Sequence, residues 1–262
     1  MNKPVQGHTV RKRFGQNFLH DQQIINRILQ SINPQSTQTI VEIGPGLGAL
    51  TKGLVESNCR LHLVELDRDL VTKLQLTYQD NPNVTIHSAD ALKFDFSALS
   101  EAGQAIRLVG NLPYNISTPL IFHLLKQADC ISDMHFMLQK EVVERLAASP
   151  AQKTYGRLTV MVQYHCLVEN LFIVPPGAFT PAPRVDSAIV CLSPHSNHEV
   201  LANDAITLEN VVRQAFGQRR KTLRNNLKPL LSPEQIESLG IDPAIRPERV
   251  TPSQFVQLAN LL

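Results

Sequence analysis

Apolar β-type runs alternate with helical patterns along most of the chain. Strand-like runs stand at 39–43, 60–66, 84–90 and 106–111, and three of them precede the helical patterns LGALTKGLVES, DRDLVTKLQLTY and STPLIFHLLKQ. This alternation predicts an α/β fold in which helices cover both faces of a parallel sheet. Asp21, and Ser117 with Pro119, are the helix-start signals that frame these repeats.

The pattern changes near residue 192. Before it come a strand-like run at 133–139, helical patterns in KEVVERLAAS and RLTVMVQYHCL, and further strand-like runs in LFIVPP and RVDSAIVCL. After it the pattern is helical only. We therefore expect a catalytic α/β domain over 1–192 and a small all-α domain over 193–262, with the polar stretch 193–199 as linker.

Composition excludes several classes of protein. The net charge is +2 over 262 residues, and the four cysteines have no C-x-x-C spacing, which argues against a zinc site or a disulfide framework. No run approaches the roughly 18 apolar residues of a membrane span. We expect a cytoplasmic monomer with reduced cysteines, no metal and no membrane contact.

The segment VEIGPGLGAL places Gly44, Gly46 and Gly48 between a predicted strand and a helix. Glycines there allow a nucleotide-like ligand to approach the backbone and the helix N-terminus. Glu65, twenty-one residues after Gly44, ends the next strand, where a carboxylate can accept from both ribose hydroxyls. Two alternatives remain: a tight strand-to-helix turn without a ligand, and a nicotinamide dehydrogenase, since Ala49 completes a permissive G-x-G-x-x-A pattern.

Two further acids favour S-adenosylmethionine as the cofactor. Glu42 lies in an otherwise apolar strand, where a buried carboxylate needs a partner, and it can orient the loop amides or a cofactor ammonium group. Asp90 follows the third strand, where it can accept from the amine of a cofactor adenine. The alternative for Asp90 is an N-cap of a short helix.

The tetrad Asn111-Leu112-Pro113-Tyr114 ends the fourth apolar strand. If the Asn111 side-chain carbonyl and a backbone carbonyl at Leu112 or Pro113 accept the two N6 hydrogens of an adenine, they direct its lone pair toward a methyl donor. Tyr114 can stack on the base. Catalysis of this kind is positioning, and Asn111 can also touch the cofactor. The alternative is a simple strand-ending turn.

In these residues the chain resembles the bacterial small-subunit ribosomal RNA adenine dimethyltransferases, whose relatives include macrolide-resistance rRNA methyltransferases. The resemblance covers nearly the whole chain, in RKRFGQNFL, VEIGPGLGALT, VELDRDL, GNLPYNISTPL, DMHFMLQKEVVERL, YGRLTVMVQ, FTPAPRVDSAIV and FGQRRKTLRNNL. It implies a Rossmann-like, seven-stranded methyltransferase sheet with one antiparallel strand. It also implies dimethylation of two adjacent adenosines in the 3′-terminal hairpin of small-subunit rRNA, within an assembling subunit.

The resemblance also assigns individual residues. Its motifs place contacts to S-adenosylmethionine at Asn17, Leu19, Gly44, Glu65, Asp90 and Asn111. The motif FTPAPRVDS aligns with the family's target-base loop, in which Phe179 would stack on the flipped adenine opposite Tyr114.

Basic residues gather at two places. If 213–228 is one continuous helix, its basic side chains share about one third of the circumference. With the basic N-terminus they would form a surface that follows RNA phosphates. The alternative is a solvated charged face. The residues expected to contact RNA are Arg11, Lys12, Arg13, Arg213, Arg219, Arg220, Lys221, Arg224 and Lys228.

Other functions remain possible from the sequence. A DNA adenine methyltransferase is a weaker alternative, since those more often carry Pro-Pro after the Asn or Asp. A non-catalytic assembly factor would give no reason for Glu65, Asp90 and the tetrad to occur together. A dehydrogenase is the weakest, since the second half holds no hydride-acceptor site.

Overall fold

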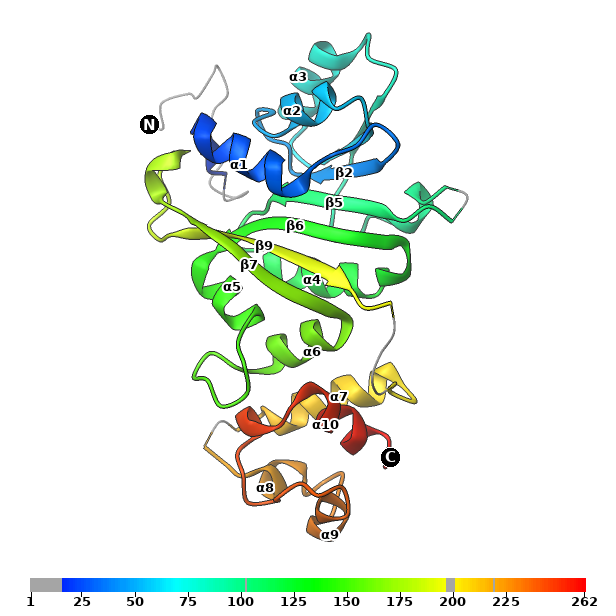
Figure 1. Cartoon of the computed structure of the whole chain (residues 1–262), viewed down its shortest axis with the longest axis vertical. Helices are drawn as coiled ribbons and strands as arrows, with labels where there is room; N and C mark the ends of the chain where they lie inside the picture. Colours follow the sequence, from blue (N-terminus) through cyan, green and yellow to red (C-terminus); the bar gives the residue numbers. More distant parts are fainter. Residues whose placement is uncertain (1–15, 102, 197–200, 219) are drawn as a thin grey trace. The chain divides into compact units, whose positions relative to one another are not determined.

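The computed structural model describes residues 16–101, 103–196, 201–218 and 220–262, which form two compact units. The first comprises the described part of Met1–Val143 together with Glu169–Pro194, and the second comprises Glu144–Val168 and His195–Leu262. In Figure 1 the colours follow the chain from blue near the N-terminus to red at the C-terminus. The strands are β1 (Phe18–Leu19), β2 (Thr39–Ile43), β3 (Arg60–Glu65), β4 (Val84–Ser88), β5 (Ile106–Asn111), β6 (Ile131–Gln139), β7 (Cys166–Val174), β8 (Phe179–Thr180) and β9 (Ser187–Pro194).

The α-helices separate most of these strands, as the alternation predicted. They are α1 (Gln22–Ile32), α2 (Thr51–Glu56), α3 (Arg68–Tyr78), α4 (Ser117–Leu125), α5 (Lys140–Leu146), α6 (Arg157–His165), α7 (Ala205–Ala215), α8 (Leu223–Leu227), α9 (Pro233–Glu237) and α10 (Pro252–Ala259). Asp21 caps α1, because its carboxylate accepts from the backbone N–H groups of Gln23 and Ile24. The expected helix start at Asp21 is therefore confirmed.

Seven strands form one sheet in the order β4-β3-β2-β5-β6-β9-β7. β2 is parallel to β3 and β5, β4 is parallel to β3, and β6 is parallel to β5. β9 runs antiparallel to β6. The α/β sheet expected from the sequence is confirmed. Because the parallel strands end at one edge, the loops after β2, β3, β4 and β5 meet there.

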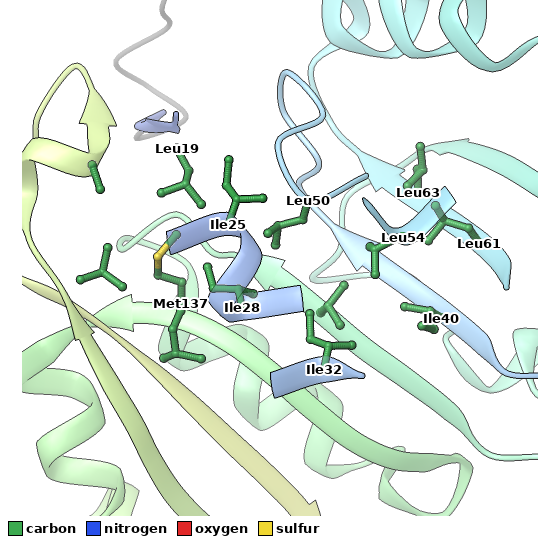
Figure 2. Close-up of a cluster of buried hydrophobic side chains, with 14 of the residues drawn as sticks. Leu19, Ile25, Ile28, Ile32, Ile40, Leu50, Leu54, Leu61, Leu63 and Met137 are labelled. Carbon is green, nitrogen blue, oxygen red and sulfur yellow. The ribbon is translucent and has the colours of Figure 1, made fainter. Parts of the chain in front are cut away.

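The isoleucines of α1 anchor that helix to an apolar core. Ile25, Ile28 and Ile32 are buried at helical spacing and belong to a cluster that includes Ile40 of β2 and Leu61 of β3. Figure 2 labels these three side chains along α1, among the side chains of the buried cluster. The core therefore holds the helix that follows the N-terminal strand β1 in a fixed position.

A close backbone approach joins β5 to β2. Gly110 is buried in β5, and a Cβ atom added there would lie 2.5 Å from the carbonyl oxygen of Ile43. Only glycine permits this approach without displacing backbone. The strand that carries Asn111 is thereby held against the strand that leads into the glycine loop.

The helix expected through Leu167 is too long. α6 ends at His165, and Cys166 and Leu167 open β7 instead. β7 lies next to β9 in the sheet, so strand pairing overrides the helical pattern of RLTVMVQYHCL. No glycine or proline at this junction signals the change.

The condition set for the basic residues, one continuous helix over 213–228, is not met. α7 ends at Ala215, and α8 begins at Leu223. Gly217 follows the end of α7. A glycine in a helix interior is about 1 kcal/mol less favourable than an alanine, so this residue disfavours a longer helix. Asn226 stabilises the intervening turn, because its amide donates to the carbonyl of Gln218 over 3.2 Å.

The second compact unit is helical and includes residues that precede residue 193. Its helices α6, α7, α8 and α10 contact one another, and the Tyr155 hydroxyl donates to the Val250 carbonyl over 2.8 Å. This compact unit thus includes residues 144–168, which the sequence pattern placed in the α/β domain. The function expected of each part stays a prediction.

All four cysteines are free thiols. Among the described residues, no group of His, Cys, Asp and Glu could hold a metal ion, and none of their helices has the length and apolar character of a membrane span.

Candidate active site

A cavity of about 340 Å³ lies in the first compact unit, at the carboxyl edge of the parallel strands. Three carboxylates line it, and its lining contains no Lys, Arg or His side chain in the described part of the chain. The lining includes nearly all of the predicted cofactor and base contacts: Asn17, Leu19, Glu42, Gly44, Gly46, Glu65, Asp90, Asn111, Leu112, Pro113 and Tyr114. The structure therefore brings together residues that are spread over almost a hundred positions.

The glycine loop is closed by backbone contacts that require left-handed conformations. Gly44 and Gly46 have φ of 66° and 59°, which strain residues with a Cβ. The Gly44 N–H donates to the Val64 carbonyl over 2.9 Å, joining the loop to the end of β3. The loop is thus folded into position by its own sequence.

Glu65 holds the loop through its carboxylate. It accepts from the Gly46 N–H at 3.2 Å and from the Asp67 N–H at 2.9 Å. Burial raises the pKa of Glu65, while these backbone donors oppose that rise. The carboxylate that we predicted to bind a ribose also orders the glycine loop and the start of α3.

Glu42 is buried beside Glu65. Its carboxylate accepts a hydrogen bond from the Thr51 hydroxyl over 2.6 Å. Thr51 is thus the partner that we expected for a carboxylate buried in an apolar strand. Burial is the main reason that its pKa rises to about 7, and the nearby Glu65 raises it further. A cationic group bound in the cavity would favour the ionised form.

Asp90 forms a turn at the end of β4. Its carboxylate accepts from the Leu92 N–H over 3.0 Å, and its carbonyl accepts from the Lys93 N–H. The N-cap alternative is wrong, since a turn and no helix follows. The side chain lines the cavity on the β4 side.

Asn111 is oriented by a long-range hydrogen bond. Its Nδ2 donates to the Asn17 carbonyl over 2.9 Å, which assigns Oδ1 as the atom left to accept. Oδ1 accepts no hydrogen bond from the described part of the chain. The amide therefore presents an acceptor, as the sequence hypothesis requires.

The next two residues differ in their carbonyls. The Pro113 carbonyl accepts from the Ile116 N–H over 3.1 Å. The Leu112 carbonyl accepts nothing from the described residues, while the Leu112 N–H donates to Met137 of β6 over 3.2 Å. Of the two carbonyls that the sequence left open, Leu112 has the freer acceptor.

Tyr114 is half-buried, and hydrogen bonds fix it at two points. Its hydroxyl lies 2.7 Å from the Ser187 hydroxyl of β9, and its carbonyl accepts from the Ser117 hydroxyl over 3.1 Å. Burial raises the pKa of the Tyr114 phenol. The ring is therefore a neutral, fixed platform at the cavity.

Phe179 does not line the cavity. In β8 it pairs with Leu19 of β1, and its side chain is only 3% exposed within the apolar core that also contains Val174 and Ile189. Stacking on a base would require this ring to leave that core. Its predicted contact with the target base stays a prediction.

The predicted RNA contacts are spread over several elements. Arg213 lies in the last turn of α7, Arg220 and Lys221 lie in the turn that follows, Arg224 lies in α8, and Lys228 is the C-cap of α8; all five are exposed. Arg224 and Lys228 line a shallow hollow with Pro229 and Leu231. Arg11, Lys12, Arg13 and Arg219 lie outside the described residues.

Sequence reasoning missed three supporting residues. Thr51 holds Glu42, Ser187 holds Tyr114, and Gln16 donates to Asp67 over 3.1 Å. Thr51 and Ser187 both lie inside quoted motifs, yet single hydroxyl residues give no signal of their partners. Only the fold pairs them.

The sheet order, the antiparallel β9 and the glycine loop followed by acids at successive strand ends define a Rossmann-like methyltransferase fold. The solved structures agree. One is a dimethyladenosine transferase from Plasmodium falciparum, at 26% identity and TM-score 0.79, covering 92% of this chain and 95% of that one. Another is the 23S rRNA methyltransferase ErmE, at 25% identity and TM-score 0.72, covering 93% and 98%.

The chain belongs to the ribosomal RNA adenine dimethylase family, whose pattern matches residues 7–262. It is 60% identical over 255 residues to ribosomal RNA small subunit methyltransferase A of Pseudomonas aeruginosa, covering 97% of this chain and 95% of that protein. The protein of the same name from Pseudomonas putida is 58% identical, with 100% and 98% covered. The family resemblance expected from the motifs is confirmed.

Proposed function

We propose that the protein transfers methyl groups from S-adenosylmethionine to the N6 amines of two adjacent adenosines in the 3′-terminal hairpin of small-subunit rRNA, in an assembling small subunit. Membership of the family and the relatives named above support the reaction class. The observation that carries the cofactor assignment is the charge of the cavity. Three carboxylates line it, and no Lys, Arg or His side chain of the described residues does.

That charge distinguishes two cofactors that both suit a glycine loop. A nicotinamide dinucleotide brings a pyrophosphate, and this anion is repelled by the carboxylates that line the cavity wherever they are ionised. S-adenosylmethionine brings a sulfonium and an ammonium against one carboxylate, so the acidic lining attracts it. Its role when bound is to supply an electrophilic methyl group. The acidic lining therefore argues against the dehydrogenase alternative.

The target base would lie against the tetrad. Asn111 Oδ1 and the Leu112 carbonyl are the acceptors that can take the two N6 hydrogens, and Tyr114 is a fixed surface on which the base can stack. Holding the amine in this way directs its lone pair toward the methyl group, so catalysis is by positioning. The alkylated amine is acidic enough to lose its proton to water, and no side chain is required as a base.

The exposed basic residues of the second compact unit are proposed to contact rRNA phosphates. They lie on separate elements, which suits a partner recognised by shape better than a single phosphate track. The hollow beside Arg224 and Lys228 is one such contact point.

Nucleoside mass spectrometry tests this proposal. Undermethylated small subunits are incubated with the protein and S-adenosylmethionine, and N6,N6-dimethyladenosine is quantified. We expect two dimethyladenosines per particle. Binding of particle and cofactor without product would support a non-catalytic assembly factor instead, and product on DNA alone would support a DNA methyltransferase.

A further inference from the structure

Two buried serine hydroxyls hold Tyr114. Ser117, at the start of α4, donates to the tyrosine carbonyl, and Ser187, at the start of β9, meets the phenol oxygen. Ser117 is 2% exposed and Ser187 is fully buried. The backbone carbonyl and the phenol hydroxyl of Tyr114 are thus each hydrogen-bonded to a serine from a different element.

The register of the sheet explains how Ser187 reaches the cavity. It pairs with Gln139, the last residue of β6, so β9 begins at the edge where the parallel strands end. Two residues further, Ile189 lies on the same face of the strand and belongs to the apolar core. Ser187 is therefore a buried polar residue that comes directly before the apolar part of this face.

A hydroxyl in that position needs a partner. Leaving a buried hydroxyl without a hydrogen bond is unfavourable, and the Tyr114 phenol meets this need at 2.7 Å. Tyr114 lines the cavity and Ser187 does not, so this hydrogen bond gives Ser187 an indirect effect on a base bound there. A serine that served packing alone would be replaced by alanine without effect on the ring.

We propose that Ser187 is a positioning residue for methyl transfer, which sets the Tyr114 ring at the angle where the target base stacks. The inference rests on the proposed function, because it takes Tyr114 as the surface for the base. A base that stacks on a fixed ring presents its amine in one direction, so a freed ring slows the transfer step more than it weakens binding.

A double-mutant cycle tests this role. Ser187→Ala, Tyr114→Phe and the double variant are compared in single-turnover methyl transfer to undermethylated small subunits, with cofactor and particle affinities and melting temperatures measured beside them. Loss of the hydrogen bond should slow transfer about fivefold in each single variant. The double variant should be no slower than the singles, since both changes remove the same contact. Cofactor affinity should stay within about twofold of the wild type.

Ser193→Ala is the matched control, because Ser193 lies in the same strand six residues further on, at its other end. It should transfer methyl groups at the wild-type rate. Wild-type rates for Ser187→Ala, or losses that multiply in the double variant, would overturn the inference. If Ser187→Ala does not fold, a wild-type rate for Tyr114→Phe does the same. If the wild-type protein makes no methylated product, the proposed function fails and the inference falls with it.

Discussion

The two sides of the cavity are held in different ways. On the cofactor side, the Glu65 carboxylate accepts hydrogen bonds from backbone N–H groups of the glycine loop and of the start of α3. These groups follow β2 and β3, two neighbouring strands of the sheet. On the base side, Asn111 is held by a residue 94 positions away and Tyr114 by one 73 positions away. The cofactor side is therefore built from neighbouring βα units, and the base side depends on two segments far along the chain, the residue before β1 and the start of β9.

The largest effect is expected from a substitution on the base side of the cavity. Asn111→Ala removes the side-chain acceptor and should lower single-turnover methyl transfer at least about a hundredfold. Cofactor affinity should fall much less, and the circular dichroism spectrum should be unchanged. A variant of near wild-type rate would contradict the role given to Asn111.

Breaking the cofactor side should give the opposite pattern. Glu65→Ala removes a carboxylate that accepts two backbone hydrogen bonds, and charged hydrogen bonds are worth about 1.5–3 kcal/mol each. We expect S-adenosylmethionine affinity, measured by calorimetry, to fall at least about tenfold, while affinity for the small subunit changes little. Equal losses in both affinities would count against the separation of the two sides.

A third change acts on the strand that both sides share. Gly110→Ala would place a methyl group 2.5 Å from the Ile43 carbonyl oxygen, so β5 and β2 must move apart. We expect a loss of about 1–3 kcal/mol in the free energy of unfolding, measured with urea. Gly177→Ala is the control, since a Cβ there meets nothing within 4 Å, and equal stability of the two variants would refute the close approach.

The smallest expected effect is a dependence of stability on pH at Glu42, on the cofactor side of the cavity. Glu42 has a pKa raised to about 7 in the folded state, so its contribution to stability is present below its ordinary pKa and is lost as pH rises through about 7. Wild-type protein should therefore lose about 1 kcal/mol relative to Glu42→Gln between about pH 6 and about pH 8. Parallel urea titrations of the two proteins measure this difference, and a constant gap would mean that Glu42 does not titrate there.

The same contrast explains what the sequence could predict. The bounds of β2 and β5, the cap at Asp21 and the placement of Glu65 beside the glycine loop follow from local patterns and from the order of parallel strands. The partners of Asn111 and Tyr114 do not, because a carbonyl at residue 17 and a serine at 187 carry no local mark. A motif alone did not predict where Phe179 lies. The family resemblance implied that its ring stacks on the target base, whereas in the structure the ring is packed in the apolar core.

Tertiary context also decided the two helices that were misjudged. The chain leaves α6 for β7 without a breaker, because a neighbouring strand offers pairing. The basic run around Gly217 bends into a turn held by Asn226, whose amide has no visible role in the sequence.

The acidic lining of the cavity has a consequence for turnover. Under the proposed function, each transfer removes the positive charge of the sulfonium, so the carboxylates attract the spent cofactor less than the fresh one. Two adenosines that each receive two methyl groups require four donor molecules in succession. The charge of the cavity would thus drive the exchange of used for fresh donor at every round.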